Sequence, residues 1–271
     1  MTNRVLYDAP GPKTLRTERI VSAIMFVALL VGLALLLKSG ADRGIFDDRW
    51  KVLYDPPKSQ TAVDVWKSLL VHGLGMTLKA ALIAAPSAFV LAFIFAIARN
   101  SKNRIVSWVS VAIIEFLRGM PVLLMMFFGL LALRLDSFSA VVFGLTLYNA
   151  AIMAEILRAG LLALPRGQAE AGTAIGLTTW ENLRIIQFPQ VITLMLPSLI
   201  SQFIVLLKDS SLGFIVGYNE LLTTMKDNYS FFGDTSRLPL FIAVVSIYLI
   251  VNISLSRLAV WVEKKLANRH A

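Results

Sequence analysis

Largely apolar runs of 17 to 29 residues alternate with polar segments along this 271-residue chain. The first run, residues 20–37, carries no charge, and as a helix it would be about 27 Å long, close to the thickness of the hydrocarbon layer of a bilayer. Five more runs follow, at residues 72–98, 105–133, 138–164, 191–207 and 238–261. They are too long and too continuous to be the strands of a membrane barrel. The pattern therefore predicts an all-α polytopic membrane bundle with six transmembrane helices.

The run at residues 105–133 needs a break. As one straight helix its 29 residues would be roughly 43 Å long, which exceeds a single perpendicular span. Gly119 and Pro121 lie near its middle, and both residue types favour a break or kink. We therefore expect the helix to be interrupted there.

Polar segments set the expected topology. Basic residues follow the second run at Arg99, Lys102 and Arg104, and others lie beyond the last run. Because positive charge favours the cytoplasmic side, both chain termini are expected to be cytoplasmic. Residues 1–19 are expected to be unstructured, and residues 38–67 and 208–237 are expected to be outward loops. The first run exceeds the 7–15 residues typical of a signal-peptide core, so it is interpreted as a retained anchor.

Composition agrees with a membrane protein, since 57% of residues are hydrophobic, 16% are charged and the mean hydropathy is +0.71. The net charge of +9 does not indicate a nucleic-acid partner, because the basic residues cluster at the ends of apolar runs. No phosphate-binding GxxxxGK[ST] motif occurs, and the sequence contains no cysteine. His72 and His270 are far apart and show no metal-ligand spacing. An enzyme would therefore lack a recognisable catalytic or metal site.

The longest polar insertion, residues 155–190, predicts two short helices. The first would run from about Arg166 to Ile175 and end at Gly176, which can adopt the left-handed conformation after a helix. Thr178 and Glu181 have the spacing of a capping box for the second helix, which is expected to stop near Pro189. Without further information this insertion is an ordinary helical connector between two spans.

Three charged pairs lie within or beside the apolar runs. Glu115 and Arg118 are three residues apart, so on a helix they can meet, either as a neutralising pair or as partners for backbone groups freed at the break. Glu155 and Arg158 repeat that spacing and are interpreted as an ion pair that orients the helix entering the polar insertion. The third pair, Lys208 and Asp209, either anchors the helix at the membrane interface or lines a polar pathway.

The polar insertion resembles the cytoplasmic coupling loop of ABC-importer permeases. Its core reads Glu170-Ala171-Gly172, and Gly176 occupies the glycine position of the family. Flanking motifs similar to the polar-amino-acid branch of that family lie at residues 165–168, 188–190, 115–121 and 208–212. The resemblance extends over residues 61–271, with Gly172 and Ser201 as departures where the family mostly has Ala and Asn.

This resemblance implies a permease subunit with residues 1–60 as N-terminus, anchor and external loop, residues 61–271 as the five-helix permease domain, and a coupling loop at about 163–190. The residues implied to dock an ATPase are Arg166, Gly167, Gln168, Glu170, Ala171, Gly176, Leu177 and Thr178. The residues implied to line the translocation pathway are Glu115, Arg118, Lys208 and Asp209.

The implied partners are an ABC ATPase dimer, a second permease chain (identical or related), an extracytoplasmic substrate-binding protein and the lipid bilayer of a bacterial cell membrane. No cofactor is expected on this chain, and ATP with Mg is expected on the ATPase. The chain is most similar to permeases of glutamate uptake systems, and Lys208 and Arg118 would suit an acidic substrate. An amino-acid transporter driven by an ion gradient is the alternative, and it would be expected to contain inverted repeats with paired broken helices.

Overall fold

The computed structural model describes residues 11–42, 44 and 48–267, and these residues contain helices and connecting segments without any β-strand. The chain divides into two compact units, Met1–Lys51 and Val52–Ala271. Residues 1–19 were expected to be unstructured, and this expectation is wrong for residues 12–19, because α1 (Pro12–Asp42) begins at Pro12. Proline is tolerated in a first helical turn, where its missing N–H has no intrahelical partner. Residues 1–10 lie outside the described residues.

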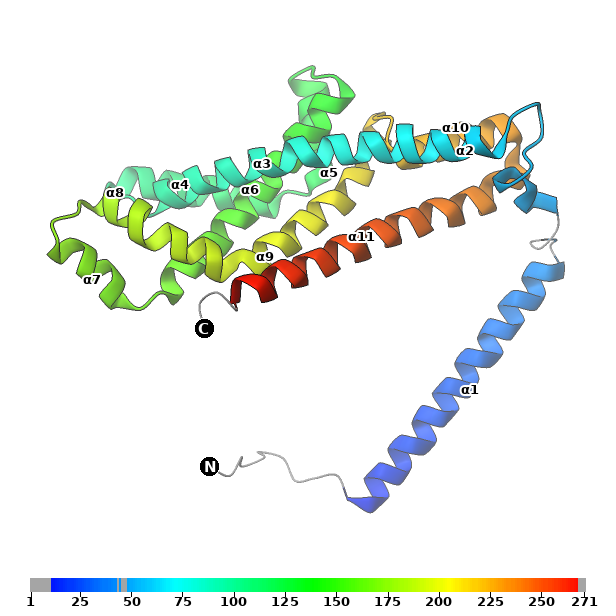
Figure 1. The fold of residues 1–271 in the computed structure, drawn as a ribbon, viewed down its shortest axis with the longest axis horizontal. Helices are drawn as coiled ribbons and strands as arrows, with labels where there is room; N and C mark the ends of the chain where they lie inside the picture. Colours follow the sequence, from blue (N-terminus) through cyan, green and yellow to red (C-terminus); the bar gives the residue numbers. More distant parts are fainter. Residues whose placement is uncertain (1–10, 43, 45–47, 268–271) are drawn as a thin grey trace. The chain divides into compact units, whose positions relative to one another are not determined.

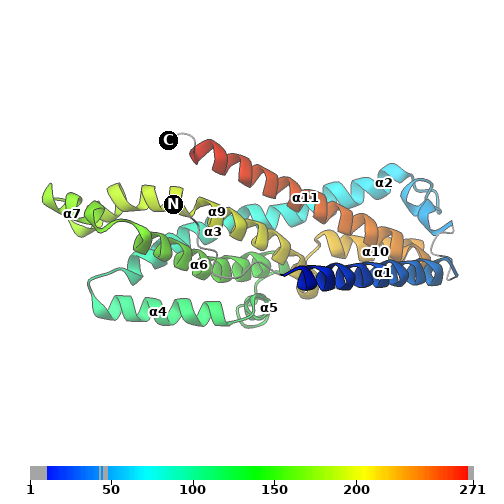
Figure 2. The same cartoon turned by 90° about the horizontal axis from the view of Figure 1, so that it is seen from below.

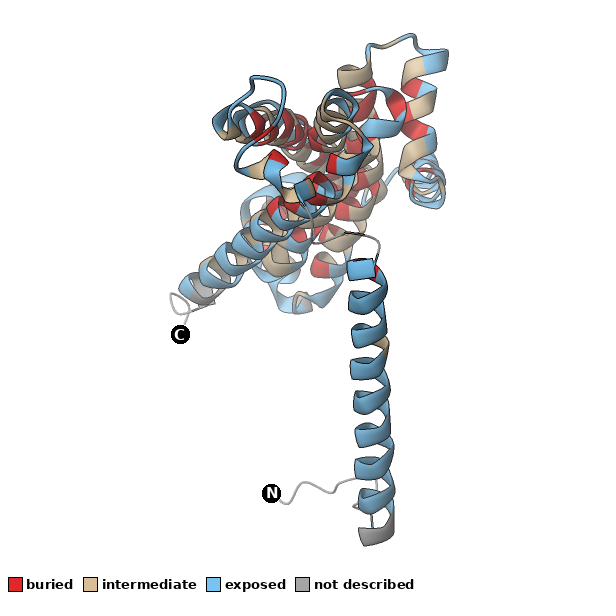
Figure 3. Cartoon of the chain, turned by 90° about the vertical axis from the view of Figure 1, so that its right-hand side faces the viewer, coloured by how far each residue is buried: buried red, intermediate tan, exposed pale blue. Residues whose placement is uncertain are grey.

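The first unit consists mainly of α1. Its apolar residues are exposed along the helix, and the ribbon of α1 is accordingly pale blue in Figure 3; Leu36, for example, is 73% exposed. Residues 20–37 within this helix carry no charge, and an uncharged apolar stretch of this length is compatible with lipid on all sides. The fold therefore agrees with the interpretation of residues 20–37 as a membrane span.

The second unit is a helical bundle (Figures 1 and 2) whose first residues, Val52 and Leu53, end the short 3₁₀ turn η1 (Asp48–Leu53). Its elements are α2 (Ala62–Lys67), η2 (Ser68–Gly73), α3 (Leu74–Arg99), α4 (Arg104–Gly119), α5 (Val122–Phe127), η3 (Phe128–Ala132), α6 (Ser137–Ala163), α7 (Arg166–Ala174), α8 (Thr179–Asn182), η4 (Leu183–Gln187), α9 (Phe188–Asp209), η5 (Ser210–Val216), α10 (Leu221–Phe232), η6 (Asp234–Ser236) and α11 (Arg237–Ala267). In Figure 1, α7 and α8 lie at one end of this unit, while α2 and α10 lie at the other.

Small residues bring the central helices of the bundle together. Ala80, Ala84, Ala88 and Ala92 recur every fourth residue along α3, and all four are fully buried. This spacing places them on one helix face, where short side chains let a neighbouring backbone approach closely. Helix α6 packs against α3 more extensively than any other helix does. The sequence of α3 thus favours close packing against α6. This packing places Arg99 of α3 beside Glu155 of α6.

The predicted break in the run at 105–133 is confirmed. Helix α4 ends at Gly119, Met120 is extended, and the following helical segment Val122–Ala132 is bent from α4 by 103°. Pro121 explains the extended residue before it, because the proline ring disfavours a helical conformation there. Within residues 11–42, 44 and 48–267, five helical runs are long and apolar enough to cross a membrane, and the bent pair would make a sixth.

Two expectations about connecting segments are wrong. The second helix of the polar insertion does not stop near Pro189, because α8 continues through the π-helical turn η4 into α9. Pro189 lies in the first turn of α9, where the missing N–H is tolerated. Residues 208–237, expected to be an outward loop, are mostly helical, because they include η5 and α10 and the buried side chains of Tyr218, Glu220 and Leu221. Their outward side stays a prediction.

Candidate functional site

The polar insertion folds into a compact segment of residues 166–187, which comprises α7, α8 and η4 and is called here the coupling segment after its expected role. Helix α7 ends in a Schellman motif, in which the N–H of Leu177 donates to the carbonyl of Gly172 at 3.1 Å and that of Gly176 donates to Thr173 at 3.0 Å. Gly176 has a φ of +86°, as predicted for the residue after the helix. The two bonds give the connection between α7 and α8 a defined geometry.

The predicted capping box at Thr178 and Glu181 is also confirmed. The hydroxyl of Thr178 accepts from the N–H of Glu181 at 3.3 Å, and the Glu181 carboxylate accepts from the N–H of Thr178 at 2.8 Å. These bonds satisfy backbone donors that have no partner within the helix. Helix α8 is only four residues long, so its direction depends on this cap and on the continuous η4 turn that follows.

Helix α7 packs back on the start of the next span through Gly172 and Asn182. The Asn182 amide donates to the carbonyl of Ala169 at 2.6 Å, and a Cβ built on Gly172 would lie 2.5 Å from the Asn182 side chain. A second contact joins Gln190 to the side-chain oxygen of Gln168 at 3.1 Å. Glycine at position 172, a departure from the usual family residue, is therefore explained by the close approach of Asn182.

The outer surface of the coupling segment is exposed and carries large apolar side chains among polar ones. Ile175 is 74% exposed and Trp180 is 46% exposed. Both side chains are therefore accessible to a partner protein. Of the residues expected to dock an ATPase, Leu177 is half-buried, and the exposed ones are Gly167, Gln168, Glu170, Ala171, Gly176 and Thr178. Arg166 begins α7, and its side chain is not among those described.

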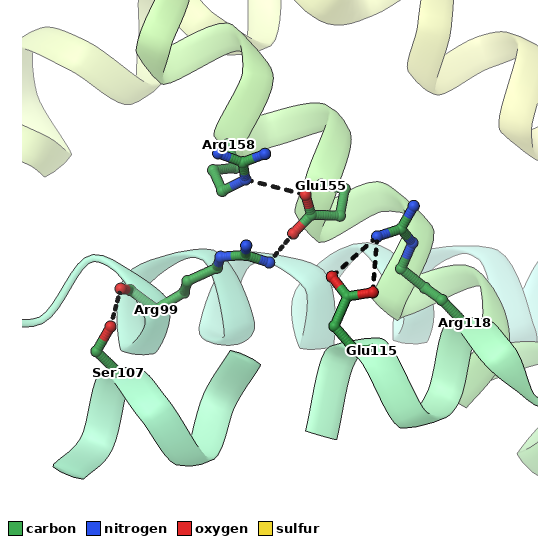
Figure 4. Close-up of polar contacts among 6 residues, drawn as sticks. All are labelled: Arg99, Ser107, Glu115, Arg118, Glu155 and Arg158. Atoms are coloured by element: carbon green, nitrogen blue, oxygen red, sulfur yellow. Dashed lines mark hydrogen bonds and ion pairs between the residues drawn. The ribbon is translucent and has the colours of Figure 1, made fainter. Parts of the chain in front are cut away.

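A second candidate region is a pocket of about 550 Å³ between the end of α4 and the middle of α6, called here the arginine pocket. Its lining residues are Arg118, Tyr148, Ile152, Glu155, Ile156, Arg158 and Ala159. Arg118 pairs with Glu115 at 3.2 Å, as the spacing predicted, and Arg158 pairs with Glu155 at 2.9 Å (Figure 4). The fold thus places Arg118 of one pair and both members of the other pair around the same pocket.

Glu155 connects the arginine pocket to α3. Its second oxygen accepts from Arg99, while the hydroxyl of Ser107 on α4 donates to the carbonyl of Arg99 at 2.7 Å (Figure 4). The Glu155 side chain is 16% exposed, and each of its oxygens accepts from one arginine. A carboxylate removed from water requires such partners. The expected Glu155–Arg158 ion pair is therefore present as one half of a larger network.

Lys208 and Asp209 lie elsewhere, at the C-terminal end of α9. Lys208 is exposed and lines a separate pocket of about 320 Å³ together with Tyr248 and Asn252. Asp209 is half-buried. The structure therefore does not bring the four residues expected in the pathway into one pocket.

Sequence reasoning missed a buried polar contact between two spans. The amide of Gln202 on α9 donates to the side-chain oxygen of Asn149 on α6 at 2.8 Å, and Asn149 donates to the carbonyl of Leu145. A lone amide within an apolar run was the available signal, because such groups are expected to find partners on neighbouring helices. Its partner could not be found without the fold, since the two residues are 53 positions apart.

The described part of the chain contains no group of three or more His, Asp or Glu side chains placed to hold a metal ion. His72 lines an open pocket of about 610 Å³ on the side of α2 and α10, with Asp64 and Asp227 among its other lining residues. The absence of a cofactor on this chain stays a prediction.

Comparison with known proteins identifies the family. Residues 65–268 match the family described as binding-protein-dependent transport system inner membrane component. The chain is 37% identical over 209 residues to the glutamate transport system permease protein GluD of Corynebacterium glutamicum, covering 74% of this chain and 76% of that protein. It is 31% identical over 211 residues to the glutamine transport system permease protein GlnP of Escherichia coli K12, covering 74% and 95%.

Among solved structures, the chain is similar to one described as an amino acid ABC transporter with histidines. The TM-score is 0.67 at 29% sequence identity, and the match covers 74% of this chain and 95% of that one. The family match extends over most of the chain and agrees with the helical fold. This chain belongs to the family of inner membrane components of binding-protein-dependent transport systems.

Proposed function

We propose that this chain forms the translocation path of an ATP-driven importer for acidic amino acids, with glutamate as the leading substrate. Membership of the family makes the chain the permease, a multi-pass membrane subunit that does not itself hydrolyse ATP. Glutamate is favoured because a relative at 37% identity is named for it. Relatives named for glutamine are also similar, so the discrimination between the two amino acids is a property to be tested.

The coupling segment is the observation that carries this proposal. Helix α7 is fixed by the Schellman motif and by Asn182, yet it exposes Ile175 on its outer side. A helix held firmly to the base of α9 can transmit the movement of a partner to the spans as a rigid body. ATP-driven closure of the ATPase dimer would move the coupling segment and switch the pathway between outward and inward access.

A two-fold ATPase dimer offers two equivalent docking sites. One permease chain provides one coupling segment, so the transporter is expected to contain a second permease chain, either identical or related. An extracytoplasmic binding protein would deliver the substrate to the opposite side of the membrane. The coupling segment and the α2–α10 end lie at opposite ends of the second unit in Figure 1, which supports this division of partners.

An importer driven by an ion gradient is less compatible with the fold. Such transporters commonly bind their substrate between paired discontinuous helices. Among the described residues a single helix pair, α4 and α5, is bent by more than 40° at a short break. Helices α3 and α9 contain Pro86 and Pro197 and still continue through them. The fold thus has one broken span and no matching second one within its described part.

Uptake into proteoliposomes tests the proposal. The permease is reconstituted with its cognate ATPase subunits and binding protein, and ionophores collapse all ion gradients. Glutamate uptake should require ATP and the binding protein and should continue without a gradient. Uptake that disappears with the gradient, or that proceeds without ATP, would contradict the proposed function. A vesicle preparation that contains the permease alone is the control for leakage.

A further inference from the structure

The arginine pocket has more positive than negative charge. Three guanidinium groups, those of Arg99, Arg118 and Arg158, face two carboxylates, those of Glu115 and Glu155. Each arginine has a carboxylate partner, but Arg99 and Arg158 share Glu155, so these five groups carry a net charge of +1. A net positive charge at a pocket lined by two arginine side chains favours the binding of an anion.

The two arginines that line the pocket still have donors available. Arg158 contacts Glu155 through Nε, and Arg118 contacts both oxygens of Glu115 through one terminal nitrogen. Among the described residues, the two terminal nitrogens of Arg158 have no hydrogen-bond acceptor. The same is true of Nε and the second terminal nitrogen of Arg118. Their side chains are 40% and 39% exposed. A guanidinium with free N–H groups is suited to a planar carboxylate.

The remaining walls fit a small amphiphilic molecule. The pocket volume of about 550 Å³ lies within the range of about 300–1,000 Å³ that small-ligand sites occupy. Ile152, Ile156 and Ala159 form an apolar wall on α6, and the Tyr148 ring belongs to the same face. Such a wall can contact the methylene groups of a ligand while the arginines bind its carboxylate.

We infer that Arg118 and Arg158 bind the side-chain carboxylate of an acidic amino acid in the arginine pocket during its passage. This inference rests on the proposed function and deepens it, since it names the groups of the permease that recognise the substrate. The side chain of glutamate ends in a carboxylate, whereas that of glutamine ends in a neutral amide. The extra positive charge therefore favours glutamate, and a neutral side chain leaves it uncompensated.

The test substitutes glutamine for Arg158 in the complete reconstituted transporter. Arg158→Gln leaves Glu155 paired with Arg99, so insertion of the chain should be preserved. Initial uptake of labelled L-glutamate and L-glutamine is measured with the same binding protein and normalised to the amount of inserted permease. Arg118→Gln provides a second variant on another helix. Arg237→Gln is the matched control, because Arg237 is also an exposed arginine that pairs with a carboxylate three residues away, outside the pocket.

Both pocket variants should lower glutamate uptake roughly 10- to 100-fold, the range expected for the loss of a charged hydrogen bond. Glutamine uptake should fall much less, so the ratio of glutamate to glutamine uptake decreases. The ratio is measured within one preparation and does not depend on the folded amount. Arg158→Lys, which retains the charge without the planar fork, should recover part of that ratio.

A glutamate rate that falls no further than in Arg237→Gln would overturn the inference, and so would an equal loss for both amino acids. In either case the wild-type transporter still takes up glutamate with ATP, so the proposed function stands. A wild-type transporter that takes up glutamine but not glutamate would remove the acidic substrate from both statements. If the wild type takes up neither with ATP, the proposed function itself fails.

Discussion

Glu220 is a fully buried carboxyl group at the start of α10. It accepts a hydrogen bond from the N–H of Thr223 at 2.9 Å and another from the hydroxyl of Tyr248 on α11 at 3.0 Å. Burial raises the pKa of Glu220 above its usual value of 4.5, against the backbone hydrogen bonds that lower it. Burial and the nearby charge of Glu220 raise the pKa of Tyr218 to about 12. The hydrogen bonds from Thr223 and Tyr248 favour the ionised carboxylate, but burial outweighs them and favours the protonated form.

The raised pKa of Glu220 predicts how stability depends on pH. Below the usual pKa both the folded and the unfolded chain carry a protonated Glu220, so the full stability is present. As pH rises through 4.5 and above, the unfolded chain loses this proton first, and the folded state becomes less favourable. Glu220→Gln mimics the neutral group, so its melting temperature should exceed that of the wild type near pH 7.

The measurement is thermal unfolding of the detergent-solubilised protein between pH 4 and pH 8. The difference between Glu220→Gln and the wild type should grow with pH and vanish near pH 4. Asp234→Asn is the control, because Asp234 is an exposed carboxylate. A difference that is constant over this pH range, or largest at low pH, would contradict the assignment.

At the residue scale, sequence spacing was sufficient for contacts within one helix and insufficient for contacts between helices. The pairs Glu115–Arg118 and Glu155–Arg158 follow from three-residue separations. Arg99 lies 56 residues before Glu155, so their contact depends on the α3–α6 packing. Glu220 lies in a polar stretch of the sequence, and nothing local shows that α10 folds over it.

At the scale of elements, the coupling segment depends on a single glycine. Gly176 has a φ of +86°, and a β-branched residue in this left-handed region costs on the order of 1–2 kcal/mol. Gly176→Val should therefore loosen the Schellman motif that connects α7 to α8. We expect the chain to insert and assemble, while substrate-stimulated ATP hydrolysis no longer produces uptake.

A matched variant separates backbone strain from coupling. Gly217 also follows a helix in the left-handed region, with a φ of +77°, and an added Cβ would meet nothing within 4 Å at either glycine. Gly217→Val thus imposes similar strain outside the coupling segment. The number of amino acids transported per ATP should fall in Gly176→Val and stay close to the wild type in Gly217→Val. Equal ratios in the two variants would remove the special role of Gly176.

The start and end signals of helices were predictable because they are local. The capping box at Thr178 and the glycine after α7 follow from residues within one or two turns. Pro189 misled the expectation for α8, since proline is compatible with the first turn of a new helix as well as with the end of an old one. The π-helical turn η4 lets the chain continue, and no pattern in the sequence identifies such a turn.

At the scale of the whole molecule, the hydropathy pattern predicted the helical membrane bundle and the approximate number of spans, because the thickness of the bilayer sets the length of its helices. The arrangement of the helices was not. The alanine stripe of α3 identifies an interface, yet several helices could have occupied it. The arginine pocket illustrates the consequence, since it needs α4 and α6 to meet before two ordinary ion pairs become a ligand site.

The continuous helical run Ala62–Arg99 predicts a membrane crossing that chemical labelling can test. Its 38 residues join Gln60 at the α2 end to Lys102 in the turn before α4, and both side chains are exposed. Because basic residues follow this run at Arg99, Lys102 and Arg104, its C-terminal end should be cytoplasmic.

The chain contains no cysteine, so a single cysteine introduced at position 60 or 102 can be labelled without background. In intact cells an impermeant thiol reagent should label Gln60→Cys and leave Lys102→Cys unlabelled, and inside-out vesicles should give the reverse. Labelling of both positions from the same side would mean that this run does not cross the membrane, and the opposite pattern would invert the orientation of the permease.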